Sequence, residues 1–381
     1  MNEFDIINNR KNTDSMKWDL HQNNAIPMWV ADMDFKCPQV IFDELTKVIS
    51  HGILGYPLIS DNYYKSVRNW FSNNHNMQLE INNIIPTTGV LPSLRTIVEE
   101  FTFKDDNIII QTPVYYMFEE IIKDSDRKVL YNPLIYNEDG SYNINFHHLN
   151  ELLKYKPKIF ILCSPHNPVG RIWQKEELVK IINYCNKNGI LLIADEIHCD
   201  LIAPGFKFHS LGSFSKEMLN NIIILNSPTK TFNLAGLRGG NAFIFNEEIR
   251  ARFKKRLNLH GANKLNTFYI KATEIAYSQA APWLTSLNNY LKNNYLYIQD
   301  FINKNLPQIK LTPLEATYLV WMNYENLKIS EDQLISKLEK DVIFSPGSKF
   351  GENGKGFIRL NIATPLEVIK KALILLKEKT L

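Results

Sequence analysis

The chain has 381 residues, of which 45% are hydrophobic and 22% charged, a composition typical of a soluble globular protein with a large core. Its 43 basic and 40 acidic residues nearly balance, so the net charge of +3 gives no indication of a nucleic-acid partner. The polar first twenty residues lack the apolar centre of a secretory signal, and no run of about eighteen apolar residues predicts a membrane span. The four cysteines form no CxxC pair, which favours free thiols and a cytoplasmic protein.

Short apolar runs rich in β-branched residues alternate with helix-length segments through the middle of the chain. The runs that predict buried parallel strands are Asn107–Gln111, Lys158–Cys163, Ile190–Ala194 and Asn221–Leu225. Between the second and third runs, Lys175–Asn188 has helical periodicity and stops at Gly189. This order predicts an α/β domain with a mainly parallel central sheet, in which ligands bind beyond the carboxyl ends of the strands.

The pattern changes from about Pro282 onward, where long helical segments precede a strand-like run at Thr317–Met322. We interpret this part as a smaller α+β domain. The predicted division is a large domain over residues 45–281 and a small one over residues 1–44 and 282–381. The place of the first forty-four residues follows from the family resemblance described below, because periodicity does not indicate it.

The segment Ser227–Gly240 places a lysine and an arginine in a turn rich in small residues. Lys230 comes shortly after the predicted strand Asn221–Leu225, and Arg238 lies eight residues later. A nucleophilic amine with hydroxyls and a guanidinium nearby suits carbonyl chemistry on a phosphorylated ligand. A solvated loop lysine is the ordinary alternative.

Two further predicted strands are followed by polar residues that precede Lys230 in the sequence. Asp195 ends an apolar run, 28 residues after Asn167 and 35 before Lys230. Asn167 lies in the turn Ser164–Gly170, and His198 follows Asp195 closely. Capping of a turn by Asp195 and simple core packing of His198 are the alternatives that the residues alone leave open.

These segments together resemble the fold-type-I pyridoxal-phosphate enzymes, the aspartate aminotransferase superfamily. The resemblance extends from about residue 27 to residue 365 and implies the fold-type-I architecture of pyridoxal-phosphate-dependent transferases. It implies that Lys230 carries pyridoxal 5′-phosphate and that Asp195 keeps the pyridine nitrogen protonated. The cofactor-binding residues that it implies are Lys230, Asp195, Asn167, His198, Tyr115, Gly89, Val90, Ser227, Arg238 and Tyr56.

At the phosphate end, the resemblance assigns backbone N–H groups of Gly89 and Val90, at a predicted helix start, together with Ser227 and Arg238. Tyr56, between Gly55 and Pro57, would reach the phosphate of a neighbouring subunit. The resemblance therefore implies a homodimer with shared active sites.

At the ring end, the resemblance assigns Asn167 and His198 to the phenolic oxygen of the cofactor. Tyr115 would stack on the pyridine face, with Tyr116 as the alternative. Core packing of either tyrosine stays open. We expect no metal site.

Arg359 lies within the apolar run Phe357–Ile362, where a charge is costly unless it is paired. The carboxylate of an amino-acid substrate would be a bidentate partner, and a structural ion pair is the alternative. Asn167 would contribute to the same substrate site.

The segment Pro27–Phe35 narrows the resemblance to the MalY/PatB group of cystathionine β-lyases and cysteine C–S lyases. By this resemblance Ala31 and Asp32 would line the substrate entrance. The parts that Asp32 and Asp34 play are not determined by their spacing.

The branch resemblance implies a carbon–sulfur β-lyase that acts on cystathionine or another S-conjugate of L-cysteine and releases a thiol, pyruvate and ammonia. An aminotransferase is the first alternative, because the same residues serve both reactions. A regulator that holds the cofactor and binds a protein partner is the second. Which sulfur leaving group is preferred stays open.

Overall fold

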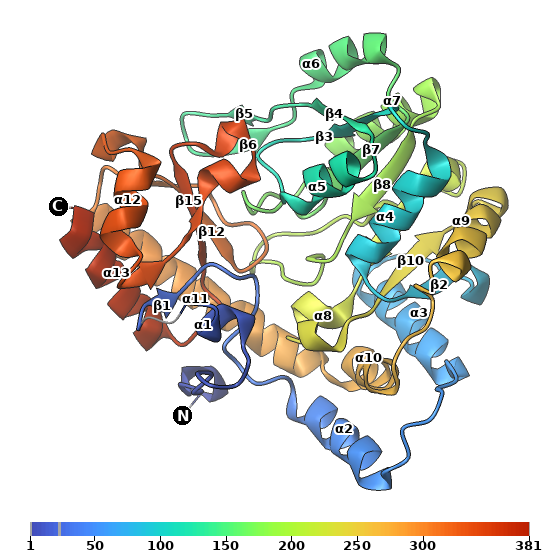
Figure 1. Ribbon diagram of the computed structural model, residues 1–381, viewed down its shortest axis with the longest axis horizontal. Coiled ribbons are helices and arrows are strands. Elements are labelled where there is room, and N and C mark those ends of the chain that lie inside the picture. The colour runs from blue at the N-terminus through green and yellow to red at the C-terminus, as the bar shows by residue number, and fades with distance from the viewer. Residues whose placement is uncertain (1, 22–23, 381) are drawn as a thin grey trace.

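The computed structural model describes residues 2–21 and 24–380, and its centre is a seven-stranded sheet covered by helices (Figure 1). The strand order across the sheet is β2 (Ile84–Thr87), β10 (Gly240–Ile244), β9 (Ile222–Asn226), β8 (Leu191–Asp195), β7 (Ile159–Cys163), β3 (Asn107–Ile110) and β4 (Lys128–Tyr131). The five neighbouring strands β9, β8, β7, β3 and β4 are parallel to one another, whereas β10 is antiparallel to both of its neighbours. The predicted α/β class with a mainly parallel sheet is confirmed.

The central strands form where apolar β-branched residues are buried on both faces of the sheet. In β3, Ile109 packs in one apolar cluster while Ile108 and Ile110 pack in another, because successive side chains point to opposite faces. Each of the four predicted strands is present, with its ends shifted by at most one residue. Polar residues therefore begin where the buried runs stop, at the carboxyl edge of the sheet.

Helices pack on the sheet and extend from it (Figure 1). Their bounds are α1 (Met16–Asp19), α2 (Gln39–His51), α3 (Asp61–His75), α4 (Val90–Phe101), α5 (Met117–Asp124), α6 (Phe146–Glu151), α7 (Lys175–Asn188), α8 (Pro228–Thr231), α9 (Glu247–Leu259), α10 (Thr267–Gln279), α11 (Ala281–Asn305), α12 (Glu331–Leu338) and α13 (Leu366–Thr380). Helix α7 has the predicted bounds. A capping box between Gln174 and Glu177 begins it, and Gly189 in the left-handed conformation ends it.

A second, antiparallel sheet lies in the C-terminal part of the chain. Its strands follow in the order β11 (Lys310–Leu311), β12 (Leu319–Asn323), β15 (Phe357–Asn361) and β14 (Ser345–Pro346). The remaining short strands are β1 (Ile26–Pro27), β5 (Ile135–Tyr136), β6 (Tyr142–Asn143) and β13 (Val342–Ile343).

The N-terminal segment is paired with the C-terminal part, since β1 is parallel to β13. In Figure 1 the blue N-terminal segment accordingly lies beside the orange and red elements. The division into residues 45–281 against 1–44 and 282–381 stays a prediction, and its end positions 1 and 381 lie outside the described residues. Within residues 2–21 and 24–380, none of the helices combines the length and hydropathy that a membrane span requires.

Candidate active site

A cavity of about 500 Å³ opens at the carboxyl edge of the central sheet, beside the start of α4 and facing β15. The predicted site residues that line it are Ala31, Gly89, Val90, Tyr115, Asn167, Asp195, His198, Lys230, Arg238 and Arg359. Three predicted residues, Tyr56, Ser227 and Asp32, do not line it. The structure thus brings together side chains that are separated by more than three hundred positions in the sequence.

Lys230 enters the cavity from α8, the single helical turn that follows β9. Ser227 caps this turn by accepting a hydrogen bond from the N–H of Thr229. The Lys230 Nζ atom donates to the carbonyl oxygen of Ala31 at 2.5 Å. Burial lowers the pKa of Lys230 to about 8, because the nearby Asp32 and Asp195 offset the desolvation only in part and Arg359 adds to it. The neutral, nucleophilic form of the amine is therefore a minor but substantial fraction at pH 7 and reaches about half near pH 8.

This pKa predicts the pH dependence of cofactor capture. Only the neutral amine attacks an aldehyde, so the rate at which cofactor-free protein binds pyridoxal 5′-phosphate should rise with pH through a midpoint near 8. Stopped-flow absorbance between pH 6 and pH 10 measures it. A midpoint near 10.4, the ordinary value for lysine, would contradict the predicted environment of Lys230.

Asp195 is the last residue of β8 and lies fully within the protein. Its Oδ1 atom accepts a hydrogen bond from the N–H of Ile197 at 3.1 Å. Burial raises the pKa of Asp195 to about 6, with the hydrogen bond from Ile197 and the charge of Lys230 opposing the rise. A buried carboxylate with so little compensation suits a cationic N–H donor in the cavity.

His198 lies close to the same end of the cavity. Burial, together with the charges of Lys230 and Arg359, lowers the pKa of His198 to about 3, so the ring is neutral. Its Nδ1 atom is buried without a hydrogen-bond partner. Buried polar atoms are usually paired, so this nitrogen is available to a ligand, and the core-packing alternative stays open.

Arg359 lies in β15, which faces the cavity from the second sheet. Its guanidinium donates to Asn167 Oδ1 at 3.0 Å, to the carbonyl oxygen of Trp29 at 2.8 Å and to Ser345 Oγ at 3.2 Å. Its Nε atom has no hydrogen-bond partner. Arg359 forms no ion pair with any carboxylate among residues 2–21 and 24–380. Burial lowers the pKa of Arg359 to about 10. The structural ion pair considered above is therefore not observed, and the site suits the carboxylate of a ligand.

Backbone donors and a cation meet at the opposite end of the cavity. Gly89, with φ of 143°, precedes the first residue of α4, and the N–H groups of Val90 and Leu91 have no acceptor within the helix. Arg238 is exposed at the cavity rim and forms no ion pair with any of the described carboxylates. A helix N-terminus beside an unpaired guanidinium suits a phosphate group.

Ser227 contributes to this end indirectly. Its hydroxyl donates to the carbonyl oxygen of Gly239 at 2.7 Å and lies 2.9 Å from Thr229 Oγ1. These bonds join the turn that carries Lys230 to the segment that follows Arg238. Direct contact of Ser227 with a phosphate stays a prediction.

Two asparagine side chains hold the N-terminal segment over Lys230. Asn361 donates to the carbonyl oxygens of Val30 and Asp32, both at 2.6 Å. Asn233, three residues after Lys230, donates to the carbonyl oxygens of Met33 and Phe35 at 3.1 Å and 2.8 Å. The cavity wall at Trp29, Val30 and Ala31 is thus fixed by β15 and by the segment that follows α8.

The two aspartates of this segment bind cations of the chain itself. Both oxygens of Asp32 accept from Arg10, at 2.5 Å and 3.0 Å. Burial alone would raise the pKa of Asp34, but Lys17, Trp18 and Arg10 lower it below its usual value. Asp34 therefore anchors the chain before residue 26. The sequence predicts Asp32 at the substrate entrance, but its side chain pairs with Arg10 and does not line the cavity.

The predicted tyrosines differ in their surroundings. Tyr115 and Tyr116 both line the cavity, with ring centroids 5.1 Å apart in an edge-to-face arrangement. Either ring can face a planar ligand, so the choice between them stays open. Tyr56 lies between α2 and α3 and is fully exposed, away from the cavity of its own chain.

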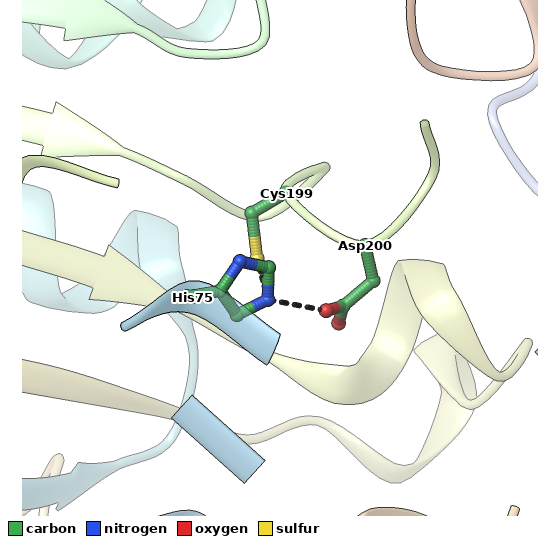
Figure 2. A group of neighbouring side chains, drawn as sticks. All are labelled: His75, Cys199 and Asp200. Carbon is green, nitrogen blue, oxygen red and sulfur yellow. Dashed lines mark hydrogen bonds and ion pairs between the residues drawn. The ribbon is translucent and has the colours of Figure 1, made fainter. Parts of the chain in front are cut away.

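Beneath the lysine turn lies a cluster that sequence analysis missed, formed by His75, Cys199 and Asp200 (Figure 2). Asp200 Oδ1 lies 2.7 Å from His75 Nε2 and accepts from the indole N–H of Trp70, and its Oδ2 accepts from the hydroxyl of Thr231 at 2.9 Å. The ligand atoms of the three residues lie within 4.8 Å of one another, as in a metal site. Both Asp200 oxygens already accept hydrogen bonds, so we interpret the cluster as support for the turn that carries Lys230.

Tyr318 is a second residue that sequence analysis missed. Its hydroxyl donates to the carbonyl oxygen of Ala31 at 3.0 Å, the same atom that Lys230 contacts. Tyr318 belongs to the predicted apolar run Thr317–Met322, so its pattern indicates only core packing. For the cluster of His75, Cys199 and Asp200 in Figure 2, the one available sequence signal was that Asp200 lies five residues after Asp195.

The donor set fits the cofactor that the resemblance implies. The Lys230 amine, with its lowered pKa, suits an aldehyde. The buried carboxylate of Asp195 suits a protonated pyridine nitrogen, and the helix start at Gly89 suits a phosphate. The open Nδ1 of His198 and the amide N–H groups of Asn167 can contact a phenolic oxygen. The buried Arg359 remains for the carboxylate of an amino acid.

Comparison with known proteins gives the same assignment. The sequence profile of aminotransferase class I and II matches residues 27–374. Cystathionine β-lyase PatB of Bacillus subtilis is 35% identical, and the match covers 97% of each chain. Cystalysin of Treponema denticola, whose crystal structure contains pyridoxal 5′-phosphate, is 36% identical with a TM-score of 0.95 over 100% of this chain and 98% of its own. The pyridoxal-phosphate-bound C–S lyase of Staphylococcus hominis is 32% identical with a TM-score of 0.92 over 99% and 98%.

Proposed function

We propose that the chain, which belongs to the aminotransferase class I and II family, is a pyridoxal-5′-phosphate-dependent carbon–sulfur β-lyase. It cleaves cystathionine or another S-conjugate of L-cysteine into a thiol, pyruvate and ammonia. The observation that carries the proposal is a buried Arg359 without an ion pair in the same cavity as Lys230, whose pKa is lowered to about 8. The full-length similarity to C–S lyases selects the reaction within the family.

In this reaction Arg359 binds the α-carboxylate of the substrate, and Asn167 orients the guanidinium through its Oδ1 atom. Pyridoxal 5′-phosphate, when bound, supplies an electron sink for the pair left at Cα. Lys230 Nζ takes the proton from Cα, which its lowered pKa allows near neutral pH. Asp195 holds the proton on the pyridine nitrogen, and the C–S bond breaks as the sulfur leaves Cβ.

The alignment of Lys230 comes from residues that surround it in the cavity. The carbonyl oxygen of Ala31 accepts from Lys230 and from Tyr318, which sets the direction of the Nζ atom. Neutral His198 offers an N–H group without adding a positive charge next to Lys230. These contacts keep the proton-transfer atom aimed at one place before substrate binds.

Incubation of the purified protein with cystathionine tests the proposal. Thiol and pyruvate should appear in equal amounts and in step with ammonia. Formation of a keto acid that retains the sulfur, without free thiol, would indicate an aminotransferase. Absence of product from cystathionine and from other S-conjugates of L-cysteine alike would contradict the proposed function.

We also propose a homodimer with shared active sites, supported by the exposure of Tyr56 and of the apolar residues around it, Ile53, Leu54 and Leu58. Mixed subunits carrying Tyr56→Ala and Lys230→Ala should then recover part of the activity that each variant lacks, because one hybrid site contains both native residues. Activity after subunit exchange, confirmed by native mass spectrometry, is the measurement. Absence of recovery in confirmed hybrids would contradict sharing.

The state of the cysteines supports a cytoplasmic location, which we propose as well. Cys37, Cys163, Cys185 and Cys199 are all free. Free thiols are usual in a reducing compartment.

A further inference from the structure

We propose that a polar hollow beside the cavity binds the second amino-acid end of the substrate, the ammonium and carboxylate carried by the departing thiol. The inference rests on the proposed lyase function and names the substrate class that the site prefers. The hollow has a volume of about 570 Å³ and shares Tyr116 and Lys349 with the cavity that contains Lys230. A substrate longer than cysteine can therefore extend from one into the other.

Lys349 supplies a cation at the junction. Its Nζ atom lies 4.3 Å from the ring centroid of Tyr116 and 5.9 Å from that of Trp29. It forms no ion pair with a carboxylate anywhere in residues 2–21 and 24–380. Cation–π contacts hold the ammonium in place without neutralising its charge, so it can still bind an anion.

Trp29 contacts both Lys349 and Arg359, and Phe350, beside Lys349 in the chain, contacts Arg359. The carbonyl oxygen of Trp29 accepts from Arg359 at 2.8 Å, while its indole ring lies under Lys349. Phe350, next to Lys349 in the chain, has its ring 4.7 Å from the Arg359 guanidinium. A substrate whose α-carboxylate is bound by Arg359 would therefore lie next to the groups that contact Lys349.

Glu120 supplies the matching anion. It lies exposed in the first turn of α5 and lines the hollow. The other acidic residues there are engaged, since Glu119 pairs with Lys123 and accepts from the Tyr131 hydroxyl, and Glu352 pairs with Lys355. Glu120 has no ion pair with a described residue.

One unpaired anion and one unpaired cation in the same hollow match a zwitterion. Cystathionine carries an amino-acid zwitterion on its leaving thiol, whereas a simple S-alkylcysteine does not. The structure therefore assigns Lys349 to the distal carboxylate and Glu120 to the distal ammonium. The expected preference is for bis-amino-acid thioethers over apolar S-conjugates of similar length.

Three thioethers separate the two contacts in the holoenzyme: L-cystathionine, S-(3-carboxypropyl)-L-cysteine, which lacks the distal amine, and S-propyl-L-cysteine, which lacks both distal charges. For each charged thioether we take the ratio of its kcat/KM to that of S-propyl-L-cysteine. In Lys349→Gln the ratios for L-cystathionine and for S-(3-carboxypropyl)-L-cysteine should both fall about fivefold, as expected for loss of an exposed ion pair. In Glu120→Gln, only the cystathionine ratio should fall. These ratios cancel any general effect of a variant on the chemistry.

Lys123→Gln is the matched control, because it removes the same charge from the same hollow where Glu119 already pairs with it. Its cystathionine ratio should stay near that of the unmodified protein. Equal ratios in Lys349→Gln and the unmodified protein, or an equal fall in Lys349→Gln and Lys123→Gln, would overturn the proposal.

A binding measurement keeps the subsite separate from the reaction. The probe is 2,7-diaminosuberate, which has the length and both zwitterions of cystathionine but no sulfur to expel. Its Kd, measured by calorimetric titration, should be about fivefold weaker in Lys349→Gln. The Kd of 2-aminooctanoate, whose tail is uncharged, is the comparison. Lys349-dependent binding without turnover of any thioether would refute the lyase and retain the subsite. Turnover without Lys349-dependent binding would refute the subsite alone.

Discussion

Replacing Lys230 by alanine is expected to lower cystathionine turnover by roughly 10²–10⁴ from loss of the proton transfer alone. No other amine occupies the position that its Nζ atom holds, 2.5 Å from the carbonyl oxygen of Ala31. The variant should also lose the visible absorption band of the protein-linked cofactor. Thiol release and the absorption spectrum are the two measurements.

A matched control and a mapping experiment complete the Lys230 test. Lys254→Ala removes an exposed lysine from α9 that does not line the cavity, and it should retain full activity. Borohydride reduction of the unmodified holoenzyme, followed by peptide mapping, should label Lys230. A label on another lysine would refute its assignment.

Replacing Asp195 by asparagine should reduce turnover by roughly 10²–10³, the effect of removing one preorganised electrostatic partner. Asparagine cannot keep the pyridine nitrogen protonated, whereas Lys230 can still capture the cofactor. The visible band should therefore persist while kcat falls. Near-normal kcat would mean that another residue holds this proton.

Stability measurements distinguish this effect from misfolding. Burial raises the pKa of Asp195 from 3.8 to about 6, so its contribution to stability is present below pH 3.8 and is lost as the pH rises through 6. At pH 8 the cofactor-free protein buries a disfavoured charge that asparagine lacks. The free energy of unfolding of cofactor-free Asp195→Asn should therefore equal or exceed that of the unmodified protein.

The sequence was sufficient for elements whose signal is local. Helix α7 has its caps and its apolar face within sixteen residues, and the strands β7, β8 and β9 are mainly apolar runs. Because polar residues follow such runs directly, the positions of Lys230, Asp195 and Asn167 at one edge of the sheet could be predicted. The antiparallel direction of β10 could not, since no residue pattern in that strand encodes which way its neighbours run.

The missed features depend on contacts between segments that are distant in the sequence. Asp32 resembles a substrate ligand in its motif, but its partner Arg10 comes from an N-terminal segment whose path the pattern does not give. Tyr318 and Asn361 reach the carbonyl oxygens of Ala31, Val30 and Asp32 from about three hundred positions away. Only the packing of the N-terminal segment against the second sheet and its flanking residues brings these groups together.

Turnover of cystathionine without any keto acid tests the central claim most directly. Expulsion of the thiolate needs no second substrate, whereas transamination requires a keto-acid acceptor before the next cycle. The account predicts homocysteine, pyruvate and ammonia through many turnovers from cystathionine alone. A single turnover that stops with the cofactor in its amine form, and resumes only when a keto acid is added, would contradict it and show an aminotransferase.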